Sequence, residues 1–408
     1  QGEIALVGLG ALVCFLGVAA LSPLLSRPVA RLVGAPFSRG VPGRLGRLNA
    51  MRNPQRTAST AAALMIGLAL VTAVGVLGAS AKASVEQVVT ASVGADVVVQ
   101  GGGFQGFPSA VAGVLERTEG VAAVDRVRQD QAQVGDDTTF LTALSPDAIG
   151  RGVRLVPVDG ELVPGPGVLL VSEGEATGND LSVGDQVSVR LSRGEPRELT
   201  VAGVYEDSEL VGPYVLDLTQ AEDFASPTDA ALLLTAEDGV DTATLVTAAE
   251  AATVDYPTVE VLDQAAFIED TTSTIDVVIS IINVLLALSV LIAVLGIVNT
   301  LALAVLERTR ELGLLRAVGL GRRQTRRMVT VEAVIVAIFG ALLGIGVGSV
   351  FGVVLQRALA DEGITELRFP VGRLVLFVVV AALAGVVAAL LPARRAARLD
   401  VLKAIATT

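Results

Sequence analysis

Residues 277–306 read VVISIINVLLALSVLIAVLGIVNTLALAVL, and ERTRELGLLRAVG follows directly at residues 307–319. The first stretch holds thirty uncharged residues, which as a helix would extend about 45 Å, whereas the hydrocarbon core of a bilayer is only about 30 Å thick. Residues 265–276, just before it, contain no glycine or proline. The sequence therefore predicts a membrane-spanning helix that continues beyond the bilayer as a stalk, and the alternative is a helix that is strongly tilted within the bilayer.

Four further apolar runs of about span length lie elsewhere in the 408 residues, of which 52% are apolar and 18% charged. The five apolar runs that predict membrane spans are residues 4–26, 57–81, 277–306, 333–356 and 374–393. The second run is also followed by a segment free of glycine and proline, up to Gly94, which predicts a second stalk helix. The predicted fold is an α-helical membrane protein with five transmembrane helices and one large extracytoplasmic α+β domain.

Charge predicts which side each loop occupies. Residues 27–56 contain seven arginines and no acid, residues 307–327 contain seven arginines and two glutamates, and residues 394–403 carry a net charge of +3. Basic loops stay in the cytoplasm. Residues 82–276, with 34 acidic and nine basic side chains, are then outside, as is the N-terminus, while the C-terminus is cytoplasmic. The formal net charge of −12 thus arises from a polarised membrane protein.

The external segment reads as a mixed α+β domain, because short runs rich in β-branched residues alternate with turn residues and helical stretches. The predicted strands are residues 96–100, 139–144, 168–172, 186–191, 199–205, 214–216 and 231–234, and the predicted helices are 109–117 and 245–252. The turn at 192–194 predicts a hairpin between the strands on either side.

Composition excludes much active-site chemistry. The chain has no histidine and one cysteine, Cys14, so histidine-based nucleophile systems, histidine metal sites and an intrachain disulfide are ruled out. No GxxxxGK[ST] phosphate loop occurs. The GxGxxG match at residues 101–106 is clustered with glycine and followed by Pro108, which favours a plain loop. We expect no catalytic residue, cofactor site or metal site in this chain, and no nucleic-acid partner for its acidic exterior.

The segment that follows the third span predicts a short amphipathic helix ended by Gly319 and Gly321. The spacing lets Glu307 pair with Arg310, and Arg308 with Glu311, on its surface. Three apolar residues, Leu312, Leu315 and Val318, recur on one side of it. That side could lie on the membrane surface, which the flanking arginines favour, or in a groove of a cytoplasmic partner.

The fourth span carries glycine at every fourth position, at Gly340, Gly344, Gly348 and Gly352. At 3.6 residues per turn these glycines share one face. Small faces let helices approach closely in lipid, which predicts a helix-packing surface.

Several motifs resemble the FtsX/MacB-type permeases of ABC transporters. ERTRELGLLRAVG at 307–319 is similar to the signature that follows the external domain in that family, and LPARRAARLDVLKAI at 391–405 resembles its C-terminal ending. NAMRNPQRTASTA at 49–61 resembles its amphipathic helix before a span. The stretches GVLLVSE, LSVGDQV and VAGVY between residues 167 and 205 are similar to its external core domain.

The resemblance implies a permease subunit that couples ATP hydrolysis by a separate ATPase to movement of an extracytoplasmic domain. The expected client is a lipid, a lipoprotein, a peptide or a cell-wall component. ATP and Mg²⁺ would be bound by the partner, a cytoplasmic ABC ATPase dimer, and this chain would not be an enzyme. The expected ATPase-docking residues are Glu307, Arg308, Arg310, Glu311, Leu312, Leu315, Arg316, Val318 and Gly319.

The resemblance also organises the chain within a bacterial plasma membrane. The expected segments are transmembrane helices at 1–26, 57–82, 273–306, 329–356 and 373–393, an arginine-rich linker with an amphipathic helix at 27–56, the MacB-like external domain with its stalk at 83–272, the coupling helix at 307–328, a short external loop at 357–372 and a cytoplasmic tail at 394–408. An external N-terminus and an odd span count suggest the C-terminal half of a ten-span member.

The missing N-terminal half, or a second permease, would be a membrane partner, beside lipid and an extracytoplasmic protein client. Two other functions compete with this one. A membrane-anchored binding or sensor module would need no ATPase, and a membrane enzyme would need an active site in the external domain.

Overall fold

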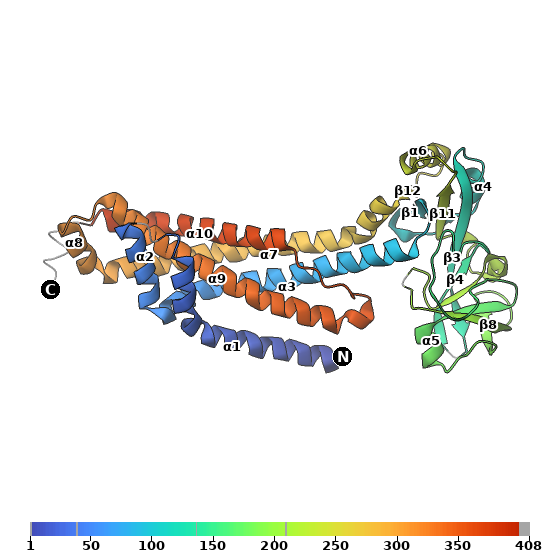
Figure 1. Ribbon diagram of the computed structural model, residues 1–408, viewed down its shortest axis with the longest axis horizontal. Helices are drawn as coiled ribbons and strands as arrows, with labels where there is room; N and C mark the ends of the chain where they lie inside the picture. Colours follow the sequence, from blue (N-terminus) through green and yellow to red (C-terminus); the bar gives the residue numbers. More distant parts are fainter. Residues whose placement is uncertain (1, 38–39, 136, 209, 400–408) are drawn as a thin grey trace. The chain divides into compact units, whose positions relative to one another are not determined.

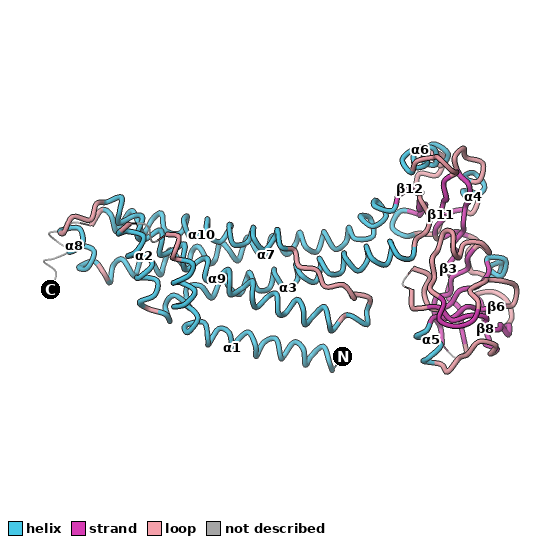
Figure 2. The backbone as a smooth tube through the Cα atoms, viewed as in Figure 1, coloured by secondary structure: helices cyan, strands magenta, loops and turns pink. Residues whose placement is uncertain are grey.

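A computed structural model describes residues 2–37, 40–135, 137–208 and 210–399. The chain divides into two compact units. The helical unit comprises Gln1–Ala83 and Thr274–Thr408, and the sheet unit comprises Ser84–Ser273. The described strands all fall between residues 97 and 263, and Figure 2 shows that they belong to the sheet unit, whereas the helical unit is built from long helices.

Long helices dominate the helical unit (Figure 1). They are α1 (Gly2–Val33), α2 (Val41–Arg52), α3 (Pro54–Ser92), α7 (Gln264–Glu307), α8 (Thr309–Ala317), α9 (Arg322–Ala358), the short η3 (Ala360–Glu362) and α10 (Val371–Ala397). α3 and α7 run without a break past the ends of their apolar stretches. This confirms the prediction of two continuous helices, because neither extension contains a helix-breaking residue.

Four helices of the described residues are long and apolar enough to cross a membrane: α3, α7, α9 and α10. The first predicted span falls in α1, which is helical but is not among these four. The fifth span therefore stays a prediction.

The core of the helical unit is built from apolar side chains of α3, α7, α9 and α10. Leu64 and Leu68 of α3, Ala293 and Ile297 of α7 and Ala337 of α9 belong to one buried cluster. Small residues let the backbones approach, as where a Cβ on Gly385 of α10 would lie 3.0 Å from the carbonyl oxygen of Ala333 on α9. Such close contacts supply the packing that holds helices together in lipid.

The described residues of the sheet unit form a ten-stranded sheet and a two-stranded ribbon. The strands are β1 (Val97–Gly101), β2 (Phe107–Pro108), β3 (Val121–Val134), β4 (Asp137–Leu144), β5 (Pro157–Gly160), β6 (Val168–Ser172), β7 (Gln186–Leu191), β8 (Arg197–Tyr205), β9 (Tyr214–Asp217), β10 (Thr228–Asp229), β11 (Ala231–Ala236) and β12 (Val259–Asp263). The short helices are η1 (Gly102–Phe104), α4 (Ala110–Leu115), α5 (Glu173–Gly178), η2 (Leu218–Asp223) and α6 (Thr242–Ala252).

Part of the sheet closes on itself. β3 pairs with β4, β4 with β9, β9 with β6, β6 with β8, β8 with β7, and β7 returns to β3. Alternate side chains fill the inside of this ring, among them Leu141, Leu169, Val189 and Val201. Closure removes the exposed edges that an open sheet would present. The antiparallel pairing of β7 with β8 confirms the predicted hairpin.

The rest of the sheet is open and has two covered faces. β12, β1, β11 and β3 lie side by side in that order. Val97 and Val99 of β1 point to the face that carries α4 and α6, where Leu245 packs. Val98, between them, points to the opposite face, where it packs with Val93 and Phe267. The period-two alternation of a strand thus supplies two separate cores from one strand.

Candidate functional site

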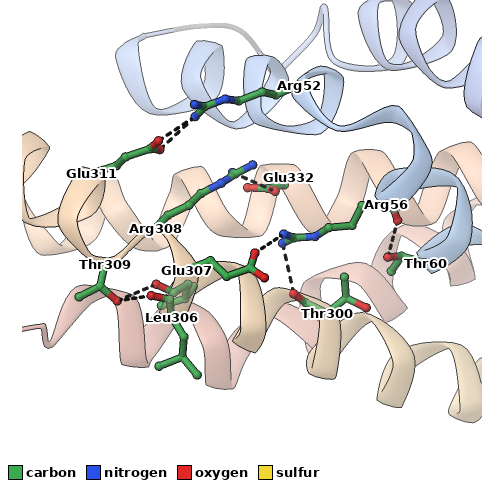
Figure 3. A network of polar contacts seen from close by, with 11 residues as sticks. Arg52, Arg56, Thr60, Thr300, Leu306, Glu307, Arg308, Thr309, Glu311 and Glu332 are labelled. Atoms are coloured by element: carbon green, nitrogen blue, oxygen red, sulfur yellow. Dashed lines mark hydrogen bonds and ion pairs between the residues drawn. The ribbon is translucent and has the colours of Figure 1, made fainter.

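The segment between α7 and α9 turns the chain twice (Figure 3 shows its first turn). α7 ends at Glu307, and Arg308 has a non-helical conformation with φ −102° and ψ 21°. The hydroxyl of Thr309 donates to the carbonyl of Leu306 at 2.7 Å. This hydrogen bond gives a partner to a backbone carbonyl at the end of α7, where the helix is interrupted. At the other end Gly319 has a φ of +110°, a region that favours glycine. α8 is thus a separate short helix, as the sequence predicted.

Two exposed ion pairs fix this segment to the elements that precede the sheet unit. Glu311 of α8 lies 3.0 Å from Nη1 of Arg52, the last residue of α2. Glu307 lies 3.0 Å from Nη1 of Arg56, in the first turn of α3, and Arg56 also donates to the carbonyl of Thr300 at 3.3 Å. The pairs predicted within the helix are therefore wrong, because the break at Arg308 turns these side chains toward α2 and α3.

A third ion pair is mostly buried. Glu332 of α9 lies 3.8 Å from Nη1 of Arg308 and accepts a hydrogen bond from Nδ2 of Asn49 on α2 at 3.3 Å. The side chains of Arg308 and Glu332 are only 14% and 12% exposed. Arg308, expected at the docking surface, is therefore held inside the unit, where it joins α9 to the break before α8.

The apolar residues of α8 do not share one environment. Leu312 is 6% exposed and belongs to the buried core with Met328 and Val329, so its assignment to the docking surface is corrected. Leu315 is half-buried, and Val318 is 84% exposed. At 100° per residue, three residues spaced three apart spread over 120° of a helix. That spread is wide enough for the first to be buried and the last to face solvent.

The exposed face of α8 consists of Arg310, Leu314 and Val318, with Gly319 following. Leu314 is 60% exposed, and Arg310 and Gly319 are exposed as well. Residues spaced four apart lie within 40° of one another, which places the three side chains on one stripe. The sequence prediction omitted Leu314; the four-residue spacing from Arg310 to Val318 is the signal that could have found it.

Arg316 lies to the side of that stripe. It is half-buried, and its Nη1 donates to the carbonyl oxygen of Leu399, just after α10. The basic residue in the last turn of α8 therefore holds the end of the described chain, rather than facing outward. Together with Glu311 and Arg308 it gives α8 polar connections to α2, α9 and the segment after α10.

The four glycines of α9 lie against α3. A Cβ placed on any of them would approach α3 closer than real Cβ atoms do, at 2.6 to 2.8 Å for three of the four. The α3 residues that these Cβ atoms would meet first are Ala61, Met65, Ala69 and Val76. The first three of these α3 residues are four apart, as the glycines are, and Val76 follows seven residues after Ala69. The stripe is therefore a seam along which α9 and α3 come into backbone contact.

The described residues include no group of three or more histidine, cysteine, aspartate or glutamate side chains that could hold a metal ion. In the sheet unit, burial raises the pKa of the Tyr205 hydroxyl, which donates to the carbonyl of Gly212 at 2.7 Å. Burial also raises the pKa of Tyr214, whose hydroxyl donates to Glu175 at 3.1 Å. Both tyrosines are structural donors, since each is engaged with a neighbouring residue.

Two family descriptions match this chain. The FtsX-like permease C-terminal family matches residues 283–401, and the MacB-like periplasmic core domain matches residues 57–252. The first match contains α8, α9, α10 and most of α7. The second contains most of α3 and of the sheet unit.

Curated relatives include the macrolide export ATP-binding/permease protein MacB of Bordetella avium (strain 197N), which is 36% identical over 139 residues. The protein of that name from Hahella chejuensis (strain KCTC 2396) is 36% identical over 143 residues. Each alignment covers 34% of this chain and 20% of the relative. The chain thus spans about a fifth of the length of the curated relatives it matches.

Solved structures that resemble the chain include the periplasmic region of MacB from Actinobacillus actinomycetemcomitans, with 12% identity and a TM-score of 0.33, over 43% of this chain and 92% of that one. The extracellular domain of the noncanonic ABC-type transporter YknZ from Gram-positive bacteria has 14% identity and a TM-score of 0.32, over 41% of this chain and 99% of that one. The two family matches cover residues 57–252 and 283–401, so the chain combines a MacB-like periplasmic core domain with an FtsX-like permease C-terminal domain, in agreement with the predicted FtsX/MacB-type permease.

Proposed function

We propose that this chain is a transmembrane subunit on which a separate cytoplasmic ATPase docks through the exposed face of α8. The observation that carries the proposal is the pair of exposed apolar side chains, Leu314 and Val318, on a short helix whose opposite side is anchored in the core by Leu312. Apolar residues exposed on one stripe and flanked by a charge, Arg310, are suited to a groove on a partner. In this proposal ATP and Mg²⁺ bind to the partner.

The charge distribution supports a cytoplasmic position for α8. Residues 27–56 and 307–327 are both rich in arginine, whereas residues 82–276 are strongly acidic. The ion pairs of Arg52 with Glu311 and Arg56 with Glu307 join the two basic segments, which supports their placement on one side of the membrane. In this proposal that side is the cytoplasm of a bacterial cell, as the positive-inside rule favours, and the sheet unit lies outside the plasma membrane.

Continuous helices supply a route for motion. α7 leads directly into the break before α8 and is unbroken over 44 residues, and α3 is unbroken over 39. A displacement of α8 by the ATPase would pull on α7 through the backbone and on α3 through Arg56. In this proposal the sheet unit responds and acts on its client, a lipid, lipoprotein, peptide or cell-wall component.

The poor burial of α7 supports a further membrane partner. In its most apolar window 17% of α7 is buried, against 61% for α3 and 56% for α9. A second permease half, or lipid, would cover the remainder of this helix. This is the place where we propose that an N-terminal permease half or a second copy contacts the chain.

The test is to purify the full chain from its source cells and to identify the ABC ATPase that accompanies it. L314D and V318D are expected to weaken that complex at least about tenfold, because they place a charge in a desolvated contact. ATPase stimulation by the chain should fall with them. The matched control is V41D, at an exposed valine of α2 away from α8.

If no ATPase accompanies the wild-type chain, the docking proposal fails, and a membrane-anchored binding or sensor module takes its place. If an ATPase does bind, but L314D and V318D behave like V41D, the docking surface lies elsewhere.

A further inference from the structure

A cavity lies in the sheet unit, against the face of the open sheet opposite α4 and α6. Its volume is about 250 Å³. Three adjacent strands form its floor, with Val98 of β1, Leu233 of β11 and Val127 of β3 among the side chains that line it (Figure 1 shows the strands). Val98 is paired directly with Leu233 in the strand register. The floor is therefore one regular, apolar face of the sheet.

The walls come from segments outside the sheet. Val93, just past the end of α3, and Phe267, in the first turn of α7, line one part, and Val211 lines another. All three are less than 10% exposed. An occupant would therefore touch residues at both helices that connect the sheet unit to the remainder of the chain.

The lining carries no charged side chain. Its polar members are Gln100 and Gln129. Gln100 is buried, and its Nε2 donates to Oδ2 of Asp270 at 2.8 Å, whereas Gln129 is exposed and marks the polar rim. A charged ligand group would lose its hydration here and find no opposite charge. An apolar group has no favourable hydration to lose on entering the cavity, and it would gain contacts with aliphatic side chains.

We propose that this cavity binds a hydrocarbon chain, with any polar head left at the rim beside Gln129. An apolar cavity of about 150 Å³ is large enough to bind benzene, so 250 Å³ admits a larger apolar group. Most of the lining side chains are valine, leucine or alanine, so a hydrocarbon chain would make mainly aliphatic contacts in the cavity. This site is independent of α8 and of the ATPase, so it adds a ligand to the external domain whichever partner docks elsewhere.

The experiment uses the full chain in lipid nanodiscs and a straight-chain primary alcohol of about eight carbons that carries a diazirine. After illumination, mass spectrometry locates the label. Labelling is expected on peptides of β11 and the start of α7, and unlabelled alcohols should compete with it. Each added methylene should strengthen competition about fourfold until the cavity is full, since burial of one CH₂ is worth about 0.8 kcal/mol.

Filling the cavity tests its identity. A231L enlarges a half-buried residue of the floor, and should reduce labelling at these peptides at least about tenfold. The matched control is A122L, at an exposed alanine of β3 outside the cavity, which should leave labelling unchanged. A230L fills the cavity from just before β11 and serves if A231L does not fold.

A second arm places the diazirine on the acyl chain of a nanodisc phospholipid. Labelling of the cavity in this arm identifies membrane lipid as the source of the chain, and labelling by the alcohol alone identifies a free amphiphile. Either result supports the site. Labelling confined to the helical unit, or labelling of the sheet unit that survives both filling variants, overturns it.

Discussion

Glu307 and Arg56 lie 3.0 Å apart, although 251 residues separate them in the chain. The first ends α7 and the second lies in the first turn of α3. This pair connects α3, which leads into the sheet unit, with α7, which leads out of it, while Glu311 and Arg52 connect α8 with α2. Because the pairs are exposed, they contribute little to the free energy of unfolding. Their main role is to hold α8 and the end of α7 against α2 and α3.

Swapping the charges of Glu307 and Arg56 should show whether the pair positions α8 or stabilises the fold. Because exposed ion pairs are worth about 0.2 to 1 kcal/mol, E307R and R56E should each lower the unfolding free energy only slightly. Both should lower ATPase stimulation, and the double variant should restore it by re-forming the pair in reverse. A double variant no better than the worse single variant would show that the pair does not hold α8 in place. Raised salt screens the ion pair and should therefore lower ATPase stimulation by the wild-type chain.

Loss of the buried carboxylate should be far more costly. E332A leaves Arg308 buried without its ionic partner, and breaking a buried pair in this way typically costs about 3–5 kcal/mol. Thermal unfolding in detergent measures the loss. E362Q, at an exposed glutamate of η3, is the control and should stay within about 0.5 kcal/mol of wild type. If both variants unfold like wild type, the pair does not stabilise the fold.

The glycine seam should tolerate no methyl group. In G348A the new Cβ would meet the carbonyl of Ala69 and would lie 2.6 Å from Cβ of Thr72, so α9 must move away from α3. Overpacking of this kind costs about 1–3 kcal/mol. G346A, two residues earlier on the same helix, meets nothing within 4 Å and should be neutral or stabilising, since alanine favours helix. Equal melting temperatures for the two variants would contradict the seam.

Alkaline pH should act on the sheet unit through its buried tyrosines. The pKa of Tyr205 and that of Tyr214 are raised mainly by burial. Because the folded state favours the neutral form, its contribution to stability is present below the unfolded pKa of about 10. It is lost as the pH rises from there toward the folded values. Both hydroxyls should stay protonated at about pH 11, where an unperturbed tyrosine ionises.

Absorbance of tyrosinate checks this cleanly, because the chain has three tyrosines and no tryptophan. Y205F and Y214F should leave the absorbance of the folded protein at about pH 11 unchanged, since neither residue has ionised. A drop in either variant would mean that the tyrosine in question titrates normally. Circular dichroism at the same pH confirms that the protein is still folded.

Periodicity and the absence of breakers were enough to predict the long helices. Nothing in the stretch before residue 277 interrupts a helix, and α7 indeed begins at Gln264. The sequence predicted the hairpin of β7 and β8 from the turn residues at 192–194. Such features depend on neighbours within a few residues, which a single sequence displays.

The longest strand was missed. β3 runs from Val121 to Val134 and includes the polar stretch Gln129–Gln133, which no search for apolar runs would select. These residues become a strand because β4, the next strand in the chain, pairs with them, and because β7, from much further along the chain, supplies partners at their end. Tertiary context of this kind overrides local propensity.

The candidate site was predicted in outline and corrected in detail. The sequence predicted a short helix after the third span. It could not reveal that Glu311 and Glu307 would form ion pairs with arginines of α2 and α3, or that Leu312 would be buried in the core. Those outcomes depend on how α2 and α3 pack beside α8. Amphipathic spacing alone does not reveal which side of the helix these neighbours cover.

The ion pairs at the bases of α3 and α7 have an evolutionary consequence. They close the chain between Arg56 and Glu307, so that the sheet unit is an insertion within a hairpin of two helices whose bases are already joined. A different domain could be inserted at the same junctions, near Ser84 and Ser273. The glycine seam between α9 and α3 and the ion pairs of Arg52 and Arg56 would stay as they are. If an ATPase docks on α8 as proposed, a lineage carrying this helical unit could exchange the sheet unit, and with it the client, without changing the surface that binds the ATPase.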